Sequence, residues 1–277
     1  MNNLRLSTCF KSLQKKGVKA LVPYITAGDP DPTKVVELMI AIAKSGADII
    51  ELGVPFSDPM ADGPVIQRAS ERALKKGVSL ANCLEWVHEF RKYNIETPIV
   101  LMGYANPVEK FGIQEFGVRA AASGVDGVLI VDYPPEEATE FCKSMKSHGI
   151  DVIFLLAPTT SNSRLEHITK LGSGYLYYVS LRGVTGAKNI NVNDVTNSVC
   201  VIRSKTSLPV LVGFGISTPD SAGEIAATSS DGVVIGSAII DKMDEACKSG
   251  KDPIREVSFF IQELREKINI SSKVFPK

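Results

Sequence analysis

Eight short apolar runs, each followed by a longer amphipathic stretch, constrain the fold of this 277-residue chain more than any other feature. The runs are rich in β-branched residues and continuously apolar, as expected for parallel strands buried on both faces. The predicted strands span residues 20–26, 48–53, 98–104, 127–132, 151–157, 174–180, 209–215 and 232–237. Eight such units favour an α/β fold with one domain, a closed (β/α)₈ or TIM barrel over residues 1–277.

The stretches between the strands carry helix start and stop signals. Residues 32–46 begin near Pro32 and end at Gly46, and residues 108–124, 135–149, 163–172 and 218–229 follow the same logic. An extra helix is predicted before the first strand (2–17), and extra helical segments close the chain (253–268). A doubly wound open sheet is the alternative, but no G-x-G-x-x-G turn follows the first strand.

Composition and charge exclude several classes of protein. Lys+Arg and Asp+Glu both number 31, so nothing favours nucleic acid or an anionic membrane surface as a partner. The N-terminal segment has no signal-peptide core, and the longest apolar stretches, 152–157 and 232–240, are too short to span a bilayer. We therefore expect a cytoplasmic protein.

The five cysteines are scattered without a C-x-x-C motif, and the three histidines fall in predicted helices. The sequence therefore predicts neither a disulfide framework nor a metal site.

The second predicted strand carries a carboxylate, Glu51, inside an apolar run. Such a residue is costly to bury unless it is paired or functional, and a structural partner is the alternative interpretation. If Ile50 and Leu52 point outward, Glu51 points into the mouth of the barrel, where barrel enzymes place their active sites. The following loop holds Asp58 and Asp62, for which turn formation is the first interpretation.

Three further strand ends indicate a substrate site. The loop after the sixth strand, SLRGVTGAKNINVND, is long and glycine-rich, which suits either a lid or a surface connection. GFGIS (213–217) and IGSAI (235–239) end the seventh and eighth strands, where barrels often bind phosphate on backbone N–H groups and a helix N-terminus. The residues thus indicate a barrel enzyme that acts on a small phosphorylated substrate through carboxylate acid–base chemistry. Serine-hydrolase, zincin and Walker motifs are absent.

The stretch ELGVPFSDPMADGPVIQ (51–67) resembles the signature of the tryptophan synthase alpha family. The resemblance covers about residues 4 to 265, and it continues in that family's order in YITAGDP (24–30), MGYANPV (102–108), GVDGVLIVDYPPEE (124–137), SLRGVTG (180–186), GFGIS and GSAI (236–239). It implies a carbon–carbon lyase of tryptophan biosynthesis. The implied reaction is retro-aldol cleavage of indole-3-glycerol phosphate to indole and glyceraldehyde 3-phosphate.

The same resemblance implies roles for individual residues. Glu51 matches the family's catalytic glutamate, a general acid and base, and Tyr177 matches a tyrosine near the reacting side chain. Asp62 matches the catalytic aspartate, which would bind the indole N–H and stabilise its positive charge; this replaces the turn-forming interpretation. The implied substrate-binding residues are Tyr24, Met102, Leu129, Leu155 and Phe214 around the indole, Gly186, Gly215, Gly236 and Ser237 around the phosphate, and Thr185 on the lid.

The resemblance also implies a partner, a pyridoxal-phosphate-dependent beta subunit that receives the indole in an alpha2beta2 complex. The cofactor belongs to that partner, and this chain is expected to bind none. The residues expected in loops that face the partner are Pro55, Asp58, Asn106, Pro107 and Pro134.

The chain departs from the family's pattern at several positions without losing a catalytic group. Tyr24 and Met102 replace a common phenylalanine and leucine, and Val131 stands where alanine is frequent. The lid carries Leu181 and Arg182 where Ser-Arg-x-Gly is common. Two alternatives stay open, a stand-alone lyase that needs no beta subunit and an allosteric activator of the beta subunit without activity. A phosphate-binding isomerase barrel is disfavoured by the Glu51–Asp62 loop.

Overall fold

The computed structural model describes residues 4–180, 192–213 and 215–274. Within these residues, nine strands form one parallel sheet with the order β5-β4-β3-β2-β1-β9-β8-β7-β6. The strands are β1 (Ala20–Thr26), β2 (Ile50–Gly53), β3 (Ile99–Gly103), β4 (Gly127–Ile130), β5 (Asp151–Val152), β6 (Phe154–Leu156), β7 (Leu176–Val179), β8 (Val210–Gly213) and β9 (Gly232–Ile235).

The two ends of this strand order are consecutive in the chain, which closes the sheet into a barrel. Only Ile153 separates β5 from β6, and its N–H donates to the carbonyl of Val128 in β4 at 2.8 Å. The predicted fifth strand, 151–157, is thus split where its pairing changes from β4 to β7. The eight predicted strand–helix units and the TIM-barrel class are confirmed.

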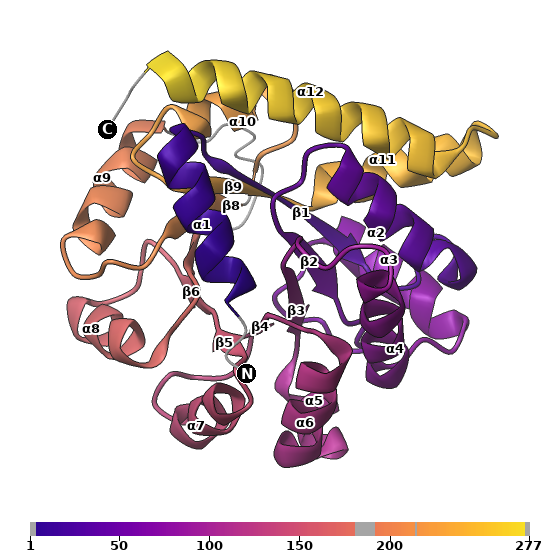
Figure 1. Cartoon of the computed structure of the whole chain (residues 1–277), viewed down its shortest axis with the longest axis horizontal. Helices are drawn as coiled ribbons and strands as arrows, with labels where there is room; N and C mark the ends of the chain where they lie inside the picture. The colour runs from indigo at the N-terminus through magenta and orange to yellow at the C-terminus, as the bar shows by residue number, and fades with distance from the viewer. Residues whose placement is uncertain (1–3, 181–191, 214, 275–277) are drawn as a thin grey trace.

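Helices surround the barrel (Figure 1). They are α1 (Arg5–Lys16), α2 (Val35–Lys44), α3 (Pro64–Lys75), α4 (Leu80–Arg91), α5 (Ala105–Phe111), α6 (Ile113–Ser123), α7 (Thr139–Ser147), α8 (Asn162–Leu171), α9 (Val192–Arg203), α10 (Pro219–Ala226), α11 (Ser237–Lys248) and α12 (Pro253–Val274), with a 3₁₀ turn at Pro32–Lys34. The predicted extra N-terminal helix is α1. The predicted closing segment is α12, which packs across α10 and α11.

Two predicted helices differ from the structure because of local backbone chemistry. The stretch 108–124 is not one helix: Gly112, at a φ of 90°, separates α5 from α6. The stretch 135–149 becomes helical only at Thr139, because it begins with two tight turns in which the carbonyls of Pro134 and Pro135 accept the N–H groups of Glu137 and Ala138. The second difference leaves a longer loop at the carboxyl end of β4, whereas only Tyr104 separates β3 from α5.

Helix α1 lies across the amino-terminal end of the barrel (Figure 1). Its Leu6 is 1% exposed, and the Leu6 Cδ1 atom lies 3.3 Å from the position of a Cβ added at Gly127 or at Gly174. Leu6 therefore packs directly against the backbone of these two glycines, and α1 covers this end of the barrel. The opposite end, where each strand leads into its helix, is the one at which a barrel binds its substrate.

Side chains that precede alternate strands also tie the amino-terminal end together. Each accepts a backbone N–H from the first or second residue of the strand before it. The four bonds are Leu21 N–H to Asp48 (2.8 Å), Ile99 N–H to Asp126 (2.7 Å), Val152 N–H to Ser173 Oγ (3.0 Å) and Val210 N–H to Asp231 (2.9 Å). These bonds connect neighbouring strands in pairs at the amino-terminal end of the barrel, opposite the open mouth.

The Asp126 carboxylate has two further partners besides the Ile99 N–H. Its carboxylate is 1% exposed and also pairs with Arg91 at 2.6 Å and Arg5 at 2.9 Å. We expect Asp126→Asn to lower the free energy of unfolding by about 3 kcal/mol, because two arginines lose a buried counter-charge. Urea unfolding at pH 7 measures this. The control is Glu140→Gln on α7, whose exposed ion pair with Lys143 should matter far less; equal losses would contradict the prediction.

Candidate active site

Glu51 lies on β2 with its side chain inside the barrel, as predicted. It is 0% exposed, and its neighbours Ile50 and Leu52 are equally buried on the opposite face of the strand. The hydroxyl of Tyr175 donates to its Oε1 at 2.5 Å, whereas Oε2 has no hydrogen-bond partner among the described residues. Burial raises the pKa of Glu51 from 4.5 to about 7, and the bond from Tyr175 opposes this rise. Such a carboxyl can both hold and release a proton near neutral pH.

Tyr175 is a site residue that sequence reasoning missed. It is fully buried, precedes β7, and stacks edge-on against Phe10 of α1 with ring centroids 6.0 Å apart. Burial and the nearby Glu51 raise the pKa of Tyr175 well above its usual value, so the hydroxyl stays protonated and donates. The only signal in the sequence was its two-residue spacing from Tyr177, which places both tyrosines on the same face of the strand.

Tyr177, the tyrosine that the sequence singled out, lies one inward position further along β7. It is 5% exposed, and a Cβ added at Gly213 of β8 would overlap its hydroxyl. Burial, and secondly the nearby Glu51 carboxylate, raise the pKa of Tyr177, so its hydroxyl stays protonated. Tyr177 therefore borders the site from the side opposite β2, while the described hydrogen bond to Glu51 comes from Tyr175.

Asp62 lies half-buried in the loop that follows β2. Burial raises the pKa of Asp62, and a hydrogen bond from Tyr104 opposes the rise. The Tyr104 hydroxyl also accepts the N–H of Ala61 at 3.1 Å, and its ring packs on Phe56 at 5.2 Å. Tyr104, which follows β3, thus holds the Asp62 loop and is a second residue that the sequence did not single out.

The predicted pocket walls lie on neighbouring strands. Tyr24 is the register partner of Glu51, and Met102 is the partner of Leu129. Tyr24, Met102 and Leu129 are buried, and Leu155 on β6 is half-buried. The strand register thus places Tyr24 beside Glu51 and Met102 beside Leu129, where these side chains can line a pocket for an apolar ring.

The predicted phosphate cradle is only partly within the described residues. Gly215 has a φ of 74° and is exposed after β8. Gly236 is the N-cap of the twelve-residue helix α11, and Ser237 is its first residue. Gly215 and the N-terminus of α11 therefore follow adjacent strands, as a phosphate site requires. Thr185, Gly186, Phe214, Leu181 and Arg182 lie outside the described residues, as does most of the predicted lid at 181–193.

The loops expected to face a partner surround the same mouth. Asp58 and Asn106 are exposed, and Pro107 and Pro134 are half-buried. Pro55 is buried in the chain itself and presents little surface. Four of the five predicted residues are therefore accessible to a partner at this end of the barrel.

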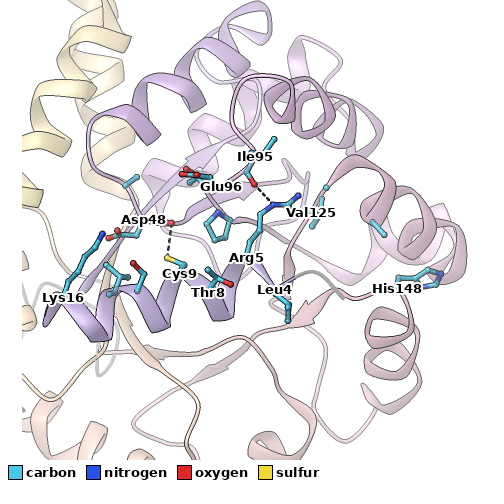
Figure 2. Close-up of a pocket in the computed structure, with 17 residues that line it drawn as sticks. Leu4, Arg5, Thr8, Cys9, Lys16, Asp48, Ile95, Glu96, Val125 and His148 are labelled. Carbon is cyan, nitrogen blue, oxygen red and sulfur yellow. Dashed lines mark hydrogen bonds between the residues drawn. The ribbon is translucent and has the colours of Figure 1, made fainter. Parts of the chain in front are cut away.

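A cavity of about 1060 Å³ lies at the other end, between α1 and the segments that precede β2, β3 and β4 (Figure 2). Cys9 and Thr8 of α1 line it opposite Asp48 and Glu96. The Cys9 thiol donates to the Asp48 carbonyl at 3.5 Å, and burial raises the pKa of Cys9 to about 12, so it is no activated nucleophile. This cavity adjoins the structural bonds of the barrel floor and not the carboxylates of the open mouth.

Other site types find no support in the described part of the chain. Its histidines, cysteines and carboxylates form no group of three that could hold a metal ion. None of its helices is long and apolar enough to cross a membrane.

Comparisons with known proteins find relatives that match nearly the whole chain. The model of the family described as tryptophan synthase alpha chain matches residues 10–269. The tryptophan synthase alpha chain of Polynucleobacter asymbioticus is 53% identical over 265 residues, which are 96% of this chain and 99% of that protein. The chain belongs to the tryptophan synthase alpha chain family. The alpha chain of Burkholderia multivorans is also 53% identical, over 94% of this chain and 95% of its own length.

Solved structures extend the similarity to the fold. The crystal structure of tryptophan synthase subunit alpha from Legionella pneumophila matches with a TM-score of 0.90 at 42% identity, covering 98% of this chain and 99% of its own. An aminoacrylate-bound tryptophan synthase from M. tuberculosis matches with a TM-score of 0.84 at 32% identity, covering 95% and 99%. The resemblance first drawn from residues 51–67 is thereby confirmed.

Proposed function

We propose that the chain cleaves indole-3-glycerol phosphate to indole and glyceraldehyde 3-phosphate, with Glu51 as general acid and base and Asp62 as the stabilising anion. The reaction is that of the alpha subunit of tryptophan synthase, the family to which the chain belongs. The observation that carries the residue assignment is the fully buried Glu51, whose pKa of about 7 suits proton transfer in both directions.

Glu51 has the chemistry that a retro-aldol cleavage needs. Its protonated form can deliver a proton to indole C3, which turns the ring into a leaving group. Its ionised form can then accept the proton of the side-chain hydroxyl as the C–C bond breaks, and the bonding electrons return to the ring. One proton enters and one leaves, so Glu51 ends in its initial state. Tyr175 holds the carboxyl through Oε1 and leaves the unpartnered Oε2 for the substrate.

Asp62 supplies a negative charge beside the cationic intermediate. Protonation at C3 makes the indole nitrogen cationic, and a carboxylate at the N–H stabilises this charge where water is excluded. Tyr24, Met102, Leu129, Leu155 and Phe214 enclose the ring in this proposal. Gly186, Gly215, Gly236 and Ser237 hold the phosphate, and Thr185 orders Asp62 from the lid. Tyr177 borders the glycerol chain.

The exposed loops at the same mouth suit a partner subunit. We infer that the chain works in the cytoplasm with a beta subunit in an alpha2beta2 complex and passes indole to it directly. The loop with Asp58 also carries Met60, which is 82% exposed although it is apolar. Exposed apolar side chains beside an active site are typical of protein interfaces. Pyridoxal phosphate acts in the beta subunit, and this chain needs no cofactor for the cleavage itself.

Indole release from indole-3-glycerol phosphate tests the proposal. We expect slow release by the purified chain and release many times faster when a beta subunit is added, because the partner covers the loops that carry Asp62. Fast release by the chain alone would identify a stand-alone lyase. No release in either condition would contradict the enzyme and leave an activator of beta, which beta-subunit kinetics with and without the chain would reveal.

A further inference from the structure

One face of α1 packs on the segment that leads into β7. Leu6 and Phe10 are four residues apart on this helix and therefore share a face. The Cδ1 atom of Leu6 lies 3.3 Å from the position of a Cβ added at Gly174. The ring of Phe10 meets the ring of Tyr175, the next residue, edge-on, with centroids 6.0 Å apart and an interplanar angle of 62°. Two successive residues before β7 are thus held by two successive turns of α1.

Helix α1 is itself fastened to the barrel at other points. Arg5 donates to the Asp126 carboxylate at 2.9 Å and to the Ile95 carbonyl at 2.8 Å. The Cys9 thiol donates to the Asp48 carbonyl at 3.5 Å. These bonds attach the helix to the segments before β4, β3 and β2, and none of them involves β7. The helix therefore gives Tyr175 a support that is fixed independently.

Tyr175 connects this support to the Glu51 carboxyl. Both side chains are 0% exposed, and the Tyr175 hydroxyl donates to Oε1 of Glu51 at 2.5 Å. Oε2 has no hydrogen-bond partner among the described residues. A carboxyl held at one oxygen turns with the donor that holds it, because hydrogen bonds are directional. The position of the Tyr175 ring therefore determines where Oε2 points.

The other ionisable groups that face Glu51 are neutral phenols. Tyr24 on β1 is its register partner, and Tyr177 lies on β7. Burial is the largest cause that raises the pKa of each phenol, so both keep their protons at neutral pH. Neither has a hydrogen bond to Glu51 within the described part of the chain, which leaves Tyr175 as the polar contact through which the protein can orient this carboxyl.

We propose that Phe10 is a positioning residue for the cleavage, which acts through the ring of Tyr175 to orient the Glu51 carboxyl and to keep Oε2 available to the substrate. The inference rests on the proposed role of Glu51. Phe10 touches no reacting atom, since α1 covers the end of the barrel opposite the open mouth (Figure 1). It gives the N-terminal helix a part in catalysis beyond closing the barrel.

The first test is a ¹³C NMR titration of the Glu51 carboxyl, with its signal identified by its absence in Glu51→Gln. Phe10→Leu keeps an apolar helix former and removes the ring edge. A weaker bond from Tyr175 to the charged form should raise the Glu51 pKa by about half a unit, and Tyr175→Phe, which deletes the donor, by about one unit. Cys9→Ala, which loosens α1 at a neighbouring point, is the matched control and should leave the titration unchanged.

Kinetics of indole release supply the second readout. Phe10→Leu should lower kcat about fivefold, the scale of one weakened hydrogen bond, and should leave KM unchanged. The basic limb of the pH profile should move upward with the Glu51 titration. In the Tyr175→Phe background the same replacement should have little further effect, because both act through one hydroxyl. Phe10→Met keeps more of the ring's volume and serves as a second variant if Phe10→Leu does not fold.

Two results would overturn the inference. One is an unchanged Glu51 titration in the folded Phe10 variants, which would make Phe10 a packing residue. The other is an equal change in Cys9→Ala, which would mean that the whole helix and not this ring contact supports the site. If the wild-type chain releases no indole but the Glu51 titration still shifts in Phe10→Leu, the positioning contact stands and the proposed function fails.

Discussion

Glu51→Gln is expected to reduce indole release by roughly 10²- to 10⁴-fold, both with and without the beta subunit, because glutamine cannot transfer a proton. The replacement has nearly the same shape and can still accept the Tyr175 hydroxyl bond at its amide oxygen, so the barrel should fold. Initial rates with indole-3-glycerol phosphate measure the effect. Glu71→Gln on α3, an exposed carboxylate, is the matched control and should keep full activity.

The same replacement should stabilise the protein at alkaline pH. The Glu51 pKa is about 7 in the folded chain and near 4.5 in the unfolded chain. As pH rises from 4.5 to 7, the carboxyl therefore ionises first in the unfolded chain, and the free energy of unfolding falls. Above pH 7 the full penalty is present, and Glu51→Gln removes it, which should add roughly 3 kcal/mol to the free energy of unfolding. At pH 4 the two proteins should differ little. Urea unfolding at pH 4 and pH 8 decides this; a variant equally stable or weaker at pH 8 would mean that burial does not raise the Glu51 pKa.

Glu51 could be found from the sequence because an ionisable residue inside an apolar strand violates the burial pattern. The alternation of apolar runs and amphipathic stretches placed it on the second of eight strands, and strand geometry then pointed its side chain inward. The cost of burying a carboxylate made function a reasonable explanation. Local pattern and elementary electrostatics were therefore sufficient for this residue, whereas the role of Asp62 required the family resemblance, because an aspartate before glycine also suits a turn.

The tyrosines that hold the two carboxylates could not be found in the same way. Tyr175 and Tyr177 share one face of the strand, and which of them meets Glu51 depends on the stagger of strands more than 120 residues apart. Tyr104 reaches Asp62 only through the path of a loop that no periodicity predicts. The division of 151–157 into β5 and β6 has a similar origin, since the run is continuously apolar and its break reflects a change of pairing partner.

Asp62→Asn is expected to lower kcat by roughly 10²- to 10³-fold, the usual cost of removing one preorganised electrostatic group from a transition state. Asparagine keeps the size of the side chain and can still accept the Tyr104 bond, so only the negative charge is lost. Steady-state kinetics of indole release in the presence of the beta subunit measure the change. Asp220→Asn, which neutralises a carboxylate of α10 whose side chain is 81% exposed, controls for net charge and should retain wild-type kinetics.

The division of the Asp62→Asn effect between kcat and KM tests the role itself. The indole nitrogen is neutral in the bound substrate and becomes cationic only after C3 is protonated. A carboxylate that serves this charge stabilises the transition state more than the ground state, so kcat should fall while KM changes little. A higher KM with unchanged kcat would contradict this and make Asp62 a recognition group for the neutral N–H. In that case Glu51 alone would carry the chemistry, and the positive charge would have to be stabilised by the pocket as a whole.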